Sequence, residues 1–259
     1  MTIQILAIGD VVGRPGRQFL RESLRRVVAR EGVDLVIANG ENAAGGLGIT
    51  GEIAAELHSV GVQVITTGDH VWRRRDIARA LMDDPRLLRP QNYPPGAPGA
   101  GLVTVTTSSG VAVRVINLLG RIFMEPVDCP FECANRILER SPGPAVTIVD
   151  FHAEATSEKG AMGWFLDGRV SAVLGTHTHV QTADERILDR GTAFISDLGM
   201  TGAIRSVLGR KVEQVVEKLR SRLYVPMEVA GGAVMMCGAI VSVDPASGRA
   251  VGIRRIAET

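Results

Sequence analysis

The chain has 259 residues, of which 45% are hydrophobic and 22% charged, as is typical of a globular protein. Its formal net charge of +1 offers no overall electrostatic case for binding nucleic acid, and no apolar run reaches the roughly 20 residues that a membrane-spanning helix needs. Three cysteines without paired Cys-x-x-Cys spacing argue against a disulfide framework, so we expect a cytoplasmic protein. α/β folds often exceed 200 residues undivided, and we expect one domain over residues 1–259.

The first half of the chain alternates short apolar strands with helices, which is typical of a parallel sheet covered by helices. Periodicity predicts strands at 3–8, 34–38 and 62–66, and helices at 16–30, 51–59 and 74–82. Each strand is followed by polar groups: Asp10, then Glu41 and Asn42, then Asp69 and His70. In open α/β sheets this edge, past the carboxyl ends of the strands, is where ligands bind.

The second half repeats the pattern after a loop rich in proline and glycine at 90–101. Strands at 102–107 and 111–117 are predicted to pair, residues 120–130 have no clear pattern, and later elements are predicted at 131–140 (helix), 145–149 (strand), 157–165 (helix), 170–174 (strand), 193–196 (strand), 211–222 (helix), 232–243 and 250–256 (a hairpin). His152 follows the strand at 145–149, and Gly175-Thr-His-Thr-His-Val180 follows the strand at 170–174.

Two histidines one residue apart, His177 and His179, stand out in this last stretch. In an extended segment their side chains point to the same side, about 6–7 Å apart at Cα. Such a pair can serve two metal ions, or a metal and a reacting group, although a chance pair at a strand end is the alternative. Four of the five histidines follow predicted strands. Imidazole and carboxylate together suit iron, manganese or zinc better than magnesium or calcium.

These motifs resemble a known family. Gly9-Asp10, Gly40-Glu-Asn42, Gly68-Asp-His70, His152 and Gly-Thr-His177-Thr-His179 resemble the ordered blocks of the calcineurin-like metallophosphoesterases, and their longer surroundings resemble the YmdB-like subgroup. The resemblance covers residues 3 to about 205. It implies an α/β fold of the αββα sandwich type, with mixed, largely parallel sheets flanked by helices. It also implies a phosphodiesterase that hydrolyses cyclic nucleotides (2′,3′- and/or 3′,5′-cyclic) with two metal ions.

The resemblance also implies a role for each motif residue. The first ion would be held by Asp10, Glu41, Asn42 and His179, and the second by Glu41, Asp69, His152 and His177. His70 would be the general acid that protonates the leaving oxygen after a metal-bridging hydroxide attacks phosphorus. Iron (Fe2+/Fe3+) is the first choice for both ions, with manganese or zinc as alternatives.

Asp69 departs from the usual family pattern, which has Gly-Asn-His where this chain has Gly68-Asp-His70. With Asp10 and Glu41 it brings three carboxylates, so two divalent ions and a hydroxide would leave the core neutral instead of positive. We therefore expect tighter metal retention and weaker Lewis acidity than an asparagine would give.

Several alternatives stay open at this point. A phosphomonoesterase or nucleotidase would use the same core, and a regulatory RNA-associated metal-binding protein with little catalysis would keep it without turnover. The expected partner is a small-molecule cyclic nucleotide or phosphodiester, with no membrane, and an oligomer of identical chains is compatible with the sequence. Arg14 and Arg17 could meet a substrate phosphate or form salt bridges at the helix start. The glycine-rich loop at 45–48 could approach a phosphate or be a plain loop.

Overall fold

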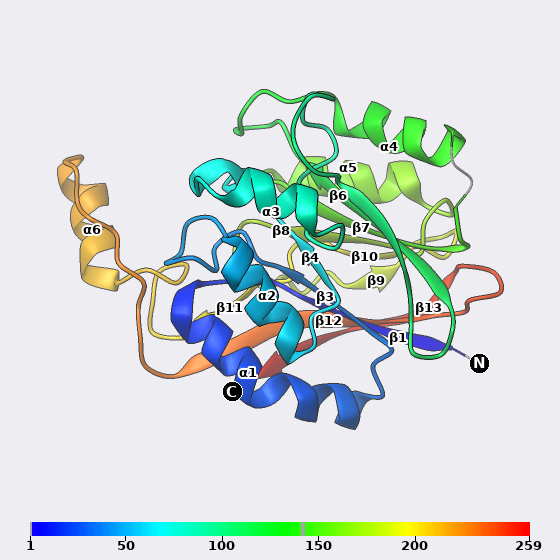
Figure 1. Ribbon diagram of the computed structural model, residues 1–259, viewed down its shortest axis with the longest axis horizontal. Coiled ribbons are helices and arrows are strands. Elements are labelled where there is room, and N and C mark those ends of the chain that lie inside the picture. The colour runs from blue at the N-terminus through cyan, green and yellow to red at the C-terminus, as the bar shows by residue number, and fades with distance from the viewer. Residues whose placement is uncertain (1, 141–142) are drawn as a thin grey trace.

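Two β-sheets pack face to face in the computed structural model, which describes residues 2–140 and 143–259, and helices cover both outer faces (Figure 1). The first sheet has the order β2-β11-β12-β1-β3-β4, with β13 also paired to β12. Its strands are β1 (Ile3–Ile8), β2 (Asp10–Val11), β3 (Leu35–Asn39), β4 (Val64–Thr66), β11 (Met200–Ala203), β12 (Val234–Val243) and β13 (Ala250–Glu258).

The second sheet has the order β5-β6-β7-β8-β10-β9. Its strands are β5 (Leu102–Thr106), β6 (Ala112–Leu119), β7 (Val146–His152), β8 (Ala172–Thr176), β9 (Arg186–Ile187) and β10 (Ala193–Ile195). Strands β6, β7, β8 and β10 are parallel, and β5 and β9 are antiparallel at the two edges. In the first sheet β1, β3 and β4 are parallel, so the carboxyl ends of the central strands of both sheets lie toward one edge of the sandwich.

The helices connect these strands. They are α1 (Gly13–Glu31), α2 (Gly51–Val60), the short 3₁₀ helix η1 (Val71–Arg73), α3 (Ile77–Asp83), α4 (Pro130–Arg140), α5 (Thr156–Leu166) and α6 (Val212–Ser221). Residues of α1, α2 and α3 pack on the first sheet, and residues of α4 and α5 pack on the second. Among the described residues, no helix is both long and apolar enough to cross a membrane.

Alternation along the strands explains the layers. In β1, Leu6 and Ile8 pack toward α1, whereas Ile5 and Ala7 pack toward the second sheet. Because successive side chains point to opposite faces, a strand buried on both faces must be apolar throughout. The predicted αββα sandwich with mixed, largely parallel sheets is therefore confirmed.

Most predicted elements are present with shifts of one to three residues at their ends, but three differences matter for the site. α1 begins at Gly13 and not at 16, so the chain turns into the helix directly after β2. β7 runs to His152, which places this histidine inside the strand and not after it. The short strands β2, β9 and β11 were not predicted, because two to four residues carry too little periodicity.

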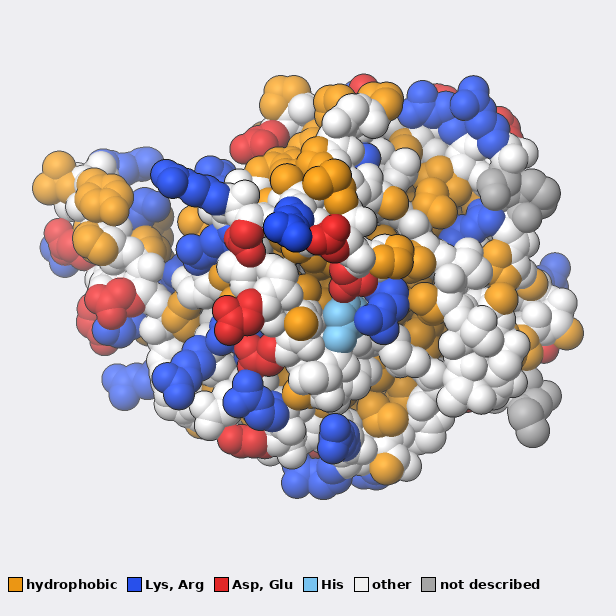
Figure 2. Space-filling model, viewed as in Figure 1, with side chains coloured by type: hydrophobic (Ala, Val, Ile, Leu, Met, Phe, Trp, Pro, Cys, Tyr) orange, Lys and Arg blue, Asp and Glu red, His pale blue; other side chains and the backbone are white. Residues whose placement is uncertain are grey.

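α6 projects away from the sandwich (Figure 1), and Figure 2 shows hydrophobic, basic and acidic side chains together on it. All ten of its residues are at least partly exposed. The rest of the face in Figure 2 has basic and acidic side chains interspersed, in line with the small net charge.

Candidate metal centre

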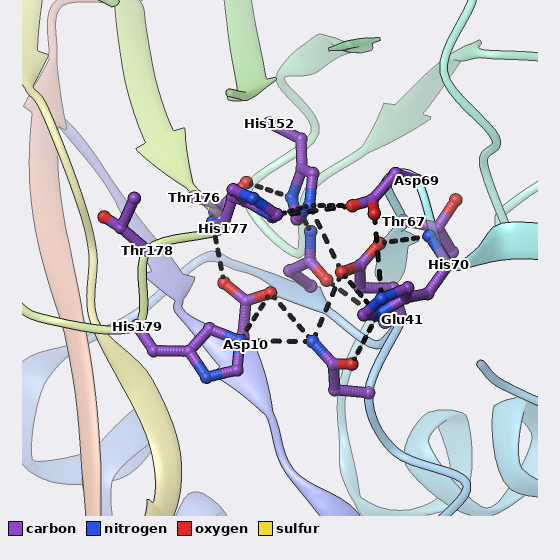
Figure 3. A network of polar contacts seen from close by, with 12 residues as sticks. Asp10, Glu41, Thr67, Asp69, His70, His152, Thr176, His177, Thr178 and His179 are labelled. Atoms are coloured by element: carbon purple, nitrogen blue, oxygen red, sulfur yellow. Dashed lines mark hydrogen bonds and ion pairs between the residues drawn. The ribbon is translucent and has the colours of Figure 1, made fainter. Parts of the chain in front are cut away.

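The eight residues singled out from the sequence meet at the carboxyl edge of the two sheets (Figure 3). We call the seven that were predicted to bind metal, which excludes the predicted acid His70, the ligand cluster: Asp10, Glu41, Asn42, Asp69, His152, His177 and His179. They come from β2, the turns after β3 and β4, the end of β7 and the segment after β8. The parallel strands bring together residues up to 169 positions apart.

One half of the ligand cluster consists of Glu41, Asp69, His152 and His177, which each offer a ligand atom within 4.8 Å of the other three. His152 Nε2 lies 3.2 Å from Glu41 Oε1 and 3.2 Å from Asp69 Oδ1. His177 Nδ1 lies 3.4 Å from the same oxygen of Asp69. Two imidazoles and two carboxylates at this spacing can surround one cation.

The other half consists of Asp10, Asn42 and His179. His179 Nε2 lies 3.5 Å from Asp10 Oδ1, and the Asn42 Nδ2 atom lies 3.4 Å from Asp10 Oδ1, 3.2 Å from His179 Nε2 and 3.2 Å from Glu41 Oε1. The oxygen and nitrogen of an amide are assigned from their surroundings, so a half-turn of this amide would present Oδ1 to a cation held by the same three groups. With Oδ1 turned inward, this half would offer one carboxylate, one amide oxygen and one imidazole, which are donor types that metal ions accept.

Charge supports the same conclusion. Burial alone would raise the pKa of Glu41, yet the His152 and His70 imidazoles hold it well below its usual range. Burial likewise favours a raised pKa for Asp10, and His179 lowers it. In turn, burial would lower the pKa of His152, but Glu41 and Asp69 raise it well above its usual range. Buried carboxylates that remain ionised need positive charge beside them, which protonated imidazoles or bound cations can supply.

The backbone of the His177-Thr178-His179 segment corrects one prediction. An extended segment was expected, but His177 has φ 101° and His179 has φ 64°, both in the left-handed region. The expectation that alternation places both side chains on one side is therefore wrong. The two imidazoles still reach different halves of the ligand cluster, because His177 approaches Asp69 and His179 approaches Asp10.

Two polar residues that the sequence did not single out, Asn39 and Thr176, support His152 and Glu41. Asn39 Nδ2 lies 3.2 Å from His152 Nδ1, and Asn39 Oδ1 accepts from the Glu41 N–H at 3.1 Å. The Thr176 hydroxyl lies 2.9 Å from His152 Nδ1 and donates to Asp150 at 2.7 Å. Such partners fix the ring of a ligating histidine. Asn39 directly precedes Gly40-Glu-Asn42, and that adjacency was the available signal.

Asp150 and Glu154 flank His152 in the sequence and contact different groups in the structure. Asp150 reaches His152 through Thr176, and burial raises the pKa of the Asp150 carboxyl to about 6. Glu154 contacts the other histidine of this half, since its Oε2 lies 3.1 Å from His177 Nε2. Both carboxylates therefore lie beside the half of the ligand cluster that contains His152 and His177.

His70 lies on the open side of the ligand cluster, and its side chain is 26% exposed. Its Nδ1 is 2.8 Å from Asn42 Oδ1 and 3.3 Å from Glu41 Oε1, and its backbone N–H donates to Glu41 Oε2 at 3.1 Å. Nε2 lies 3.6 Å from Asp69 Oδ2. The ring is thus oriented by ligand residues while one edge remains accessible.

Arg17 and the glycine-rich loop at 45–48 both have hydrogen-bond partners within the protein. Arg17 forms a salt bridge with Glu56 at 2.9 Å and donates to the Ala43 carbonyl at 2.6 Å. The glycine-rich loop presents carbonyl oxygens, not N–H groups, to its basic neighbours: Gly45 and Gly46 accept hydrogen bonds from Arg210. Arg17 therefore forms the salt bridge, and Arg210 binds the carbonyl oxygens of the glycine-rich loop.

Comparisons with known proteins show the family of this chain. A family model described as YmdB-like protein matches residues 6–256. The chain is 44% identical over 255 residues to a Bacillus subtilis protein named 2′,3′-cyclic-nucleotide 2′-phosphodiesterase, covering 98% of this chain and 96% of that protein.

Two solved structures share the fold over nearly the whole chain. A hypothetical protein from Thermus thermophilus is 38% identical with a TM-score of 0.93 and 99% of each chain covered. A Mycoplasma pneumoniae structure titled a novel phosphatase is 31% identical with a TM-score of 0.93, covering 100% of this chain and 94% of that one. A Thermus thermophilus sulfate thiohydrolase, 12% identical with a TM-score of 0.54 and covering 96% of this chain and 43% of that one, shares the fold. The chain belongs to the YmdB-like family.

Proposed function

We propose that this protein is a phosphodiesterase that hydrolyses cyclic nucleotides with two metal ions, and that 2′,3′-cyclic nucleotides are the first substrates to test. The position of Glu41 carries the proposal. This carboxylate is fully buried, and its Oε1 lies 3.2 Å from both His152 Nε2 and Asn42 Nδ2, one from each half of the ligand cluster. A carboxylate shared in this way can join two ions. The name of the Bacillus subtilis relative supports the substrate class.

The ligand cluster would divide between the two ions around Glu41. Asp10, Asn42 and His179 would hold one, and Asp69, His152 and His177 the other. When bound, two adjacent ions lower the pKa of a water and offset the charge of the phosphate. The mixed nitrogen and oxygen donors favour iron, with manganese or zinc as alternatives.

His70 would handle the proton of the leaving group. Hydrolysis of a cyclic phosphodiester breaks one P–O bond, places the oxygen of water on phosphorus, and requires a proton on the departing sugar oxygen. His70 is the histidine beside the ligand cluster whose ring is oriented by Asn42 and partly exposed. A positioned acid of this kind contributes about 10²–10⁴-fold.

The test is reconstitution of metal-free protein with Fe2+ under anaerobic conditions, or with Mn2+ or Zn2+, followed by metal analysis. The loaded protein is then assayed on 2′,3′- and 3′,5′-cyclic nucleotides, on bis-(p-nitrophenyl) phosphate and on p-nitrophenyl phosphate. We expect two ions per chain and faster hydrolysis of diesters than of the monoester. Two tightly held ions without hydrolysis of any ester would overturn the proposal and favour a regulatory metal-binding protein.

A phosphomonoesterase is the second candidate, because the Mycoplasma pneumoniae structure is titled a phosphatase. It would use the same ligand cluster. Preference for p-nitrophenyl phosphate and nucleoside monophosphates over the diesters would establish it.

A further inference from the structure

We propose that Asp197, paired with Lys159, is a positioning residue that holds both His177-Thr178-His179 and Asp10 in place for metal binding. The proposal rests on the metal centre proposed above and concerns residues outside the ligand cluster. It explains why an ion pair lies buried behind the site.

The ion pair is completely enclosed. Lys159 Nζ lies 2.8 Å from Asp197 Oδ2, and each side chain is 1% exposed. Removing two charges from water is costly, and the cost is offset only when the geometry is good and the remaining acceptor positions are filled. Here they are filled by backbone and hydroxyl groups of the segments that carry metal ligands.

Asp197 accepts two hydrogen bonds from Thr178, the residue between the two histidines. Its Oδ2 accepts from the Thr178 N–H at 3.0 Å and from the Thr178 hydroxyl at 2.7 Å. In Figure 3 the Thr178 side chain points away from the ligand cluster, so it is not a ligand itself. Its two hydrogen bonds fix the peptide link that joins His177 to His179.

That link needs outside support. His177 and His179 both have positive φ, a conformation that costs free energy in residues other than glycine and persists where the surroundings enforce it. Without the hydrogen bonds between Thr178 and Asp197, the φ angles of His177 and His179 could relax toward ordinary negative values. Relaxation would move both imidazoles away from their halves of the ligand cluster.

The same carboxylate also reaches Asp10. Asp197 Oδ1 accepts from the Gly199 N–H at 2.8 Å, and the Gly199 carbonyl accepts from the Asp10 N–H at 3.0 Å. The His177 N–H donates to Asp10 Oδ2 at 3.1 Å, so Asp10 and the histidine segment are also bonded to each other directly. One buried carboxylate therefore connects ligands that belong to the two different sheets.

Close backbone packing keeps this arrangement compact. A Cβ at Gly175 would lie 1.8 Å from the Ser196 carbonyl oxygen and 3.1 Å from Lys159 Cδ. A Cβ at Gly9 would lie 2.0 Å from the Gly199 carbonyl oxygen. The turn that follows β10 thus fits between the ends of β1 and β8, which places Asp197 at the junction.

The expected consequence is a loss of metal affinity concentrated on the ion held by Asp10 and His179. Glu41, Asp69 and His152 are positioned by β3, β4 and β7, so the other ion loses only its contact with His177. Removing a group that orients ligands weakens metal binding by about 10–100-fold.

The experiment measures dissociation constants of Mn2+ by competition with a chromophoric chelator, together with thermal unfolding of the metal-free protein. The variants are Asp197→Asn and Thr178→Val, with Thr178→Ser as the conservative variant that keeps the hydroxyl. The matched control is Asp167→Asn. Asp167 is a buried aspartate whose carboxylate accepts from the Arg190 and Thr192 N–H groups at the other end of β10.

We expect Asp197→Asn and Thr178→Val to raise the dissociation constant of the ion held by Asp10 and His179 by about tenfold or more. Thr178→Ser should have a dissociation constant close to that of wild type. Asp167→Asn should lower the unfolding temperature without changing either dissociation constant. Wild-type affinity in Thr178→Val, or in a folded Asp197→Asn, would overturn the proposal. Because Thr178 is only half-buried, its variants keep the test decisive if Asp197→Asn does not fold. If wild type itself binds fewer than two ions, the proposed metal centre fails instead.

Discussion

Replacing Asp69 by asparagine removes one charge from the ligand cluster with almost no change in shape. Asp69 Oδ1 lies 3.2 Å from His152 Nε2 and 3.4 Å from His177 Nδ1, and its side chain is 17% exposed. An ion placed among these atoms would be close to the carboxylate. Asp69→Asn therefore perturbs the electrostatics of one ion more directly than the packing of the site.

The size of the effect follows from Coulomb's law. Two unit charges 4 Å apart contribute about 4 kcal/mol at an effective dielectric constant of about 20. An asparagine oxygen keeps part of this attraction, and relief of repulsion from Asp10 and Glu41 offsets more. We expect a net loss of about 1.4–2.8 kcal/mol, which is about 10–100-fold in the dissociation constant.

The assay is a metal titration of wild type and Asp69→Asn against a competing chelator, followed by turnover of bis-(p-nitrophenyl) phosphate at saturating metal. Turnover of the saturated variant should equal or exceed that of wild type, because a more positive core is the stronger Lewis acid. Asp83→Asn is the control, since Asp83 is an exposed acid paired with Arg79 on α3. Equal or tighter metal binding in Asp69→Asn would refute the reasoning.

Three further predictions concern the site and its support. His70→Ala should lower turnover by about 10²–10⁴-fold while metal content stays at the wild-type value, and loss of metal would show that His70 is a ligand. Gly68→Ala should reduce the number of ions bound, because its Cβ would lie 2.2 Å from His152 Nε2. The control Gly96→Ala, whose Cβ would have no atom within 4 Å, should bind as many ions as wild type. Equal metal content in both variants would contradict the proposed metal centre. Phe151→Ala removes a fully buried ring from β7 and should cost about 3–5 kcal/mol in denaturant unfolding, with a loss below about 1 kcal/mol as the contrary result.

The sequence determined where the longer strands lie along the chain and which polar residues follow them. Short apolar runs separated by helices imply a parallel sheet, and parallel strands bring their carboxyl ends to one edge. Asp10, Glu41 and Asp69 could therefore be placed near one another without coordinates. These inferences succeed because they depend on a residue and its neighbours within a few positions.

Only the tertiary structure decided how the histidines are held. His177 and His179 have left-handed backbone angles, and the Thr178 N–H between them donates to Asp197, a residue from another turn that carries no motif of its own. The support of His152 by Asn39 crosses from one sheet to the other. Such contacts are set by how the two sheets pack, and a pattern read along one strand contains no information about the strand that faces it.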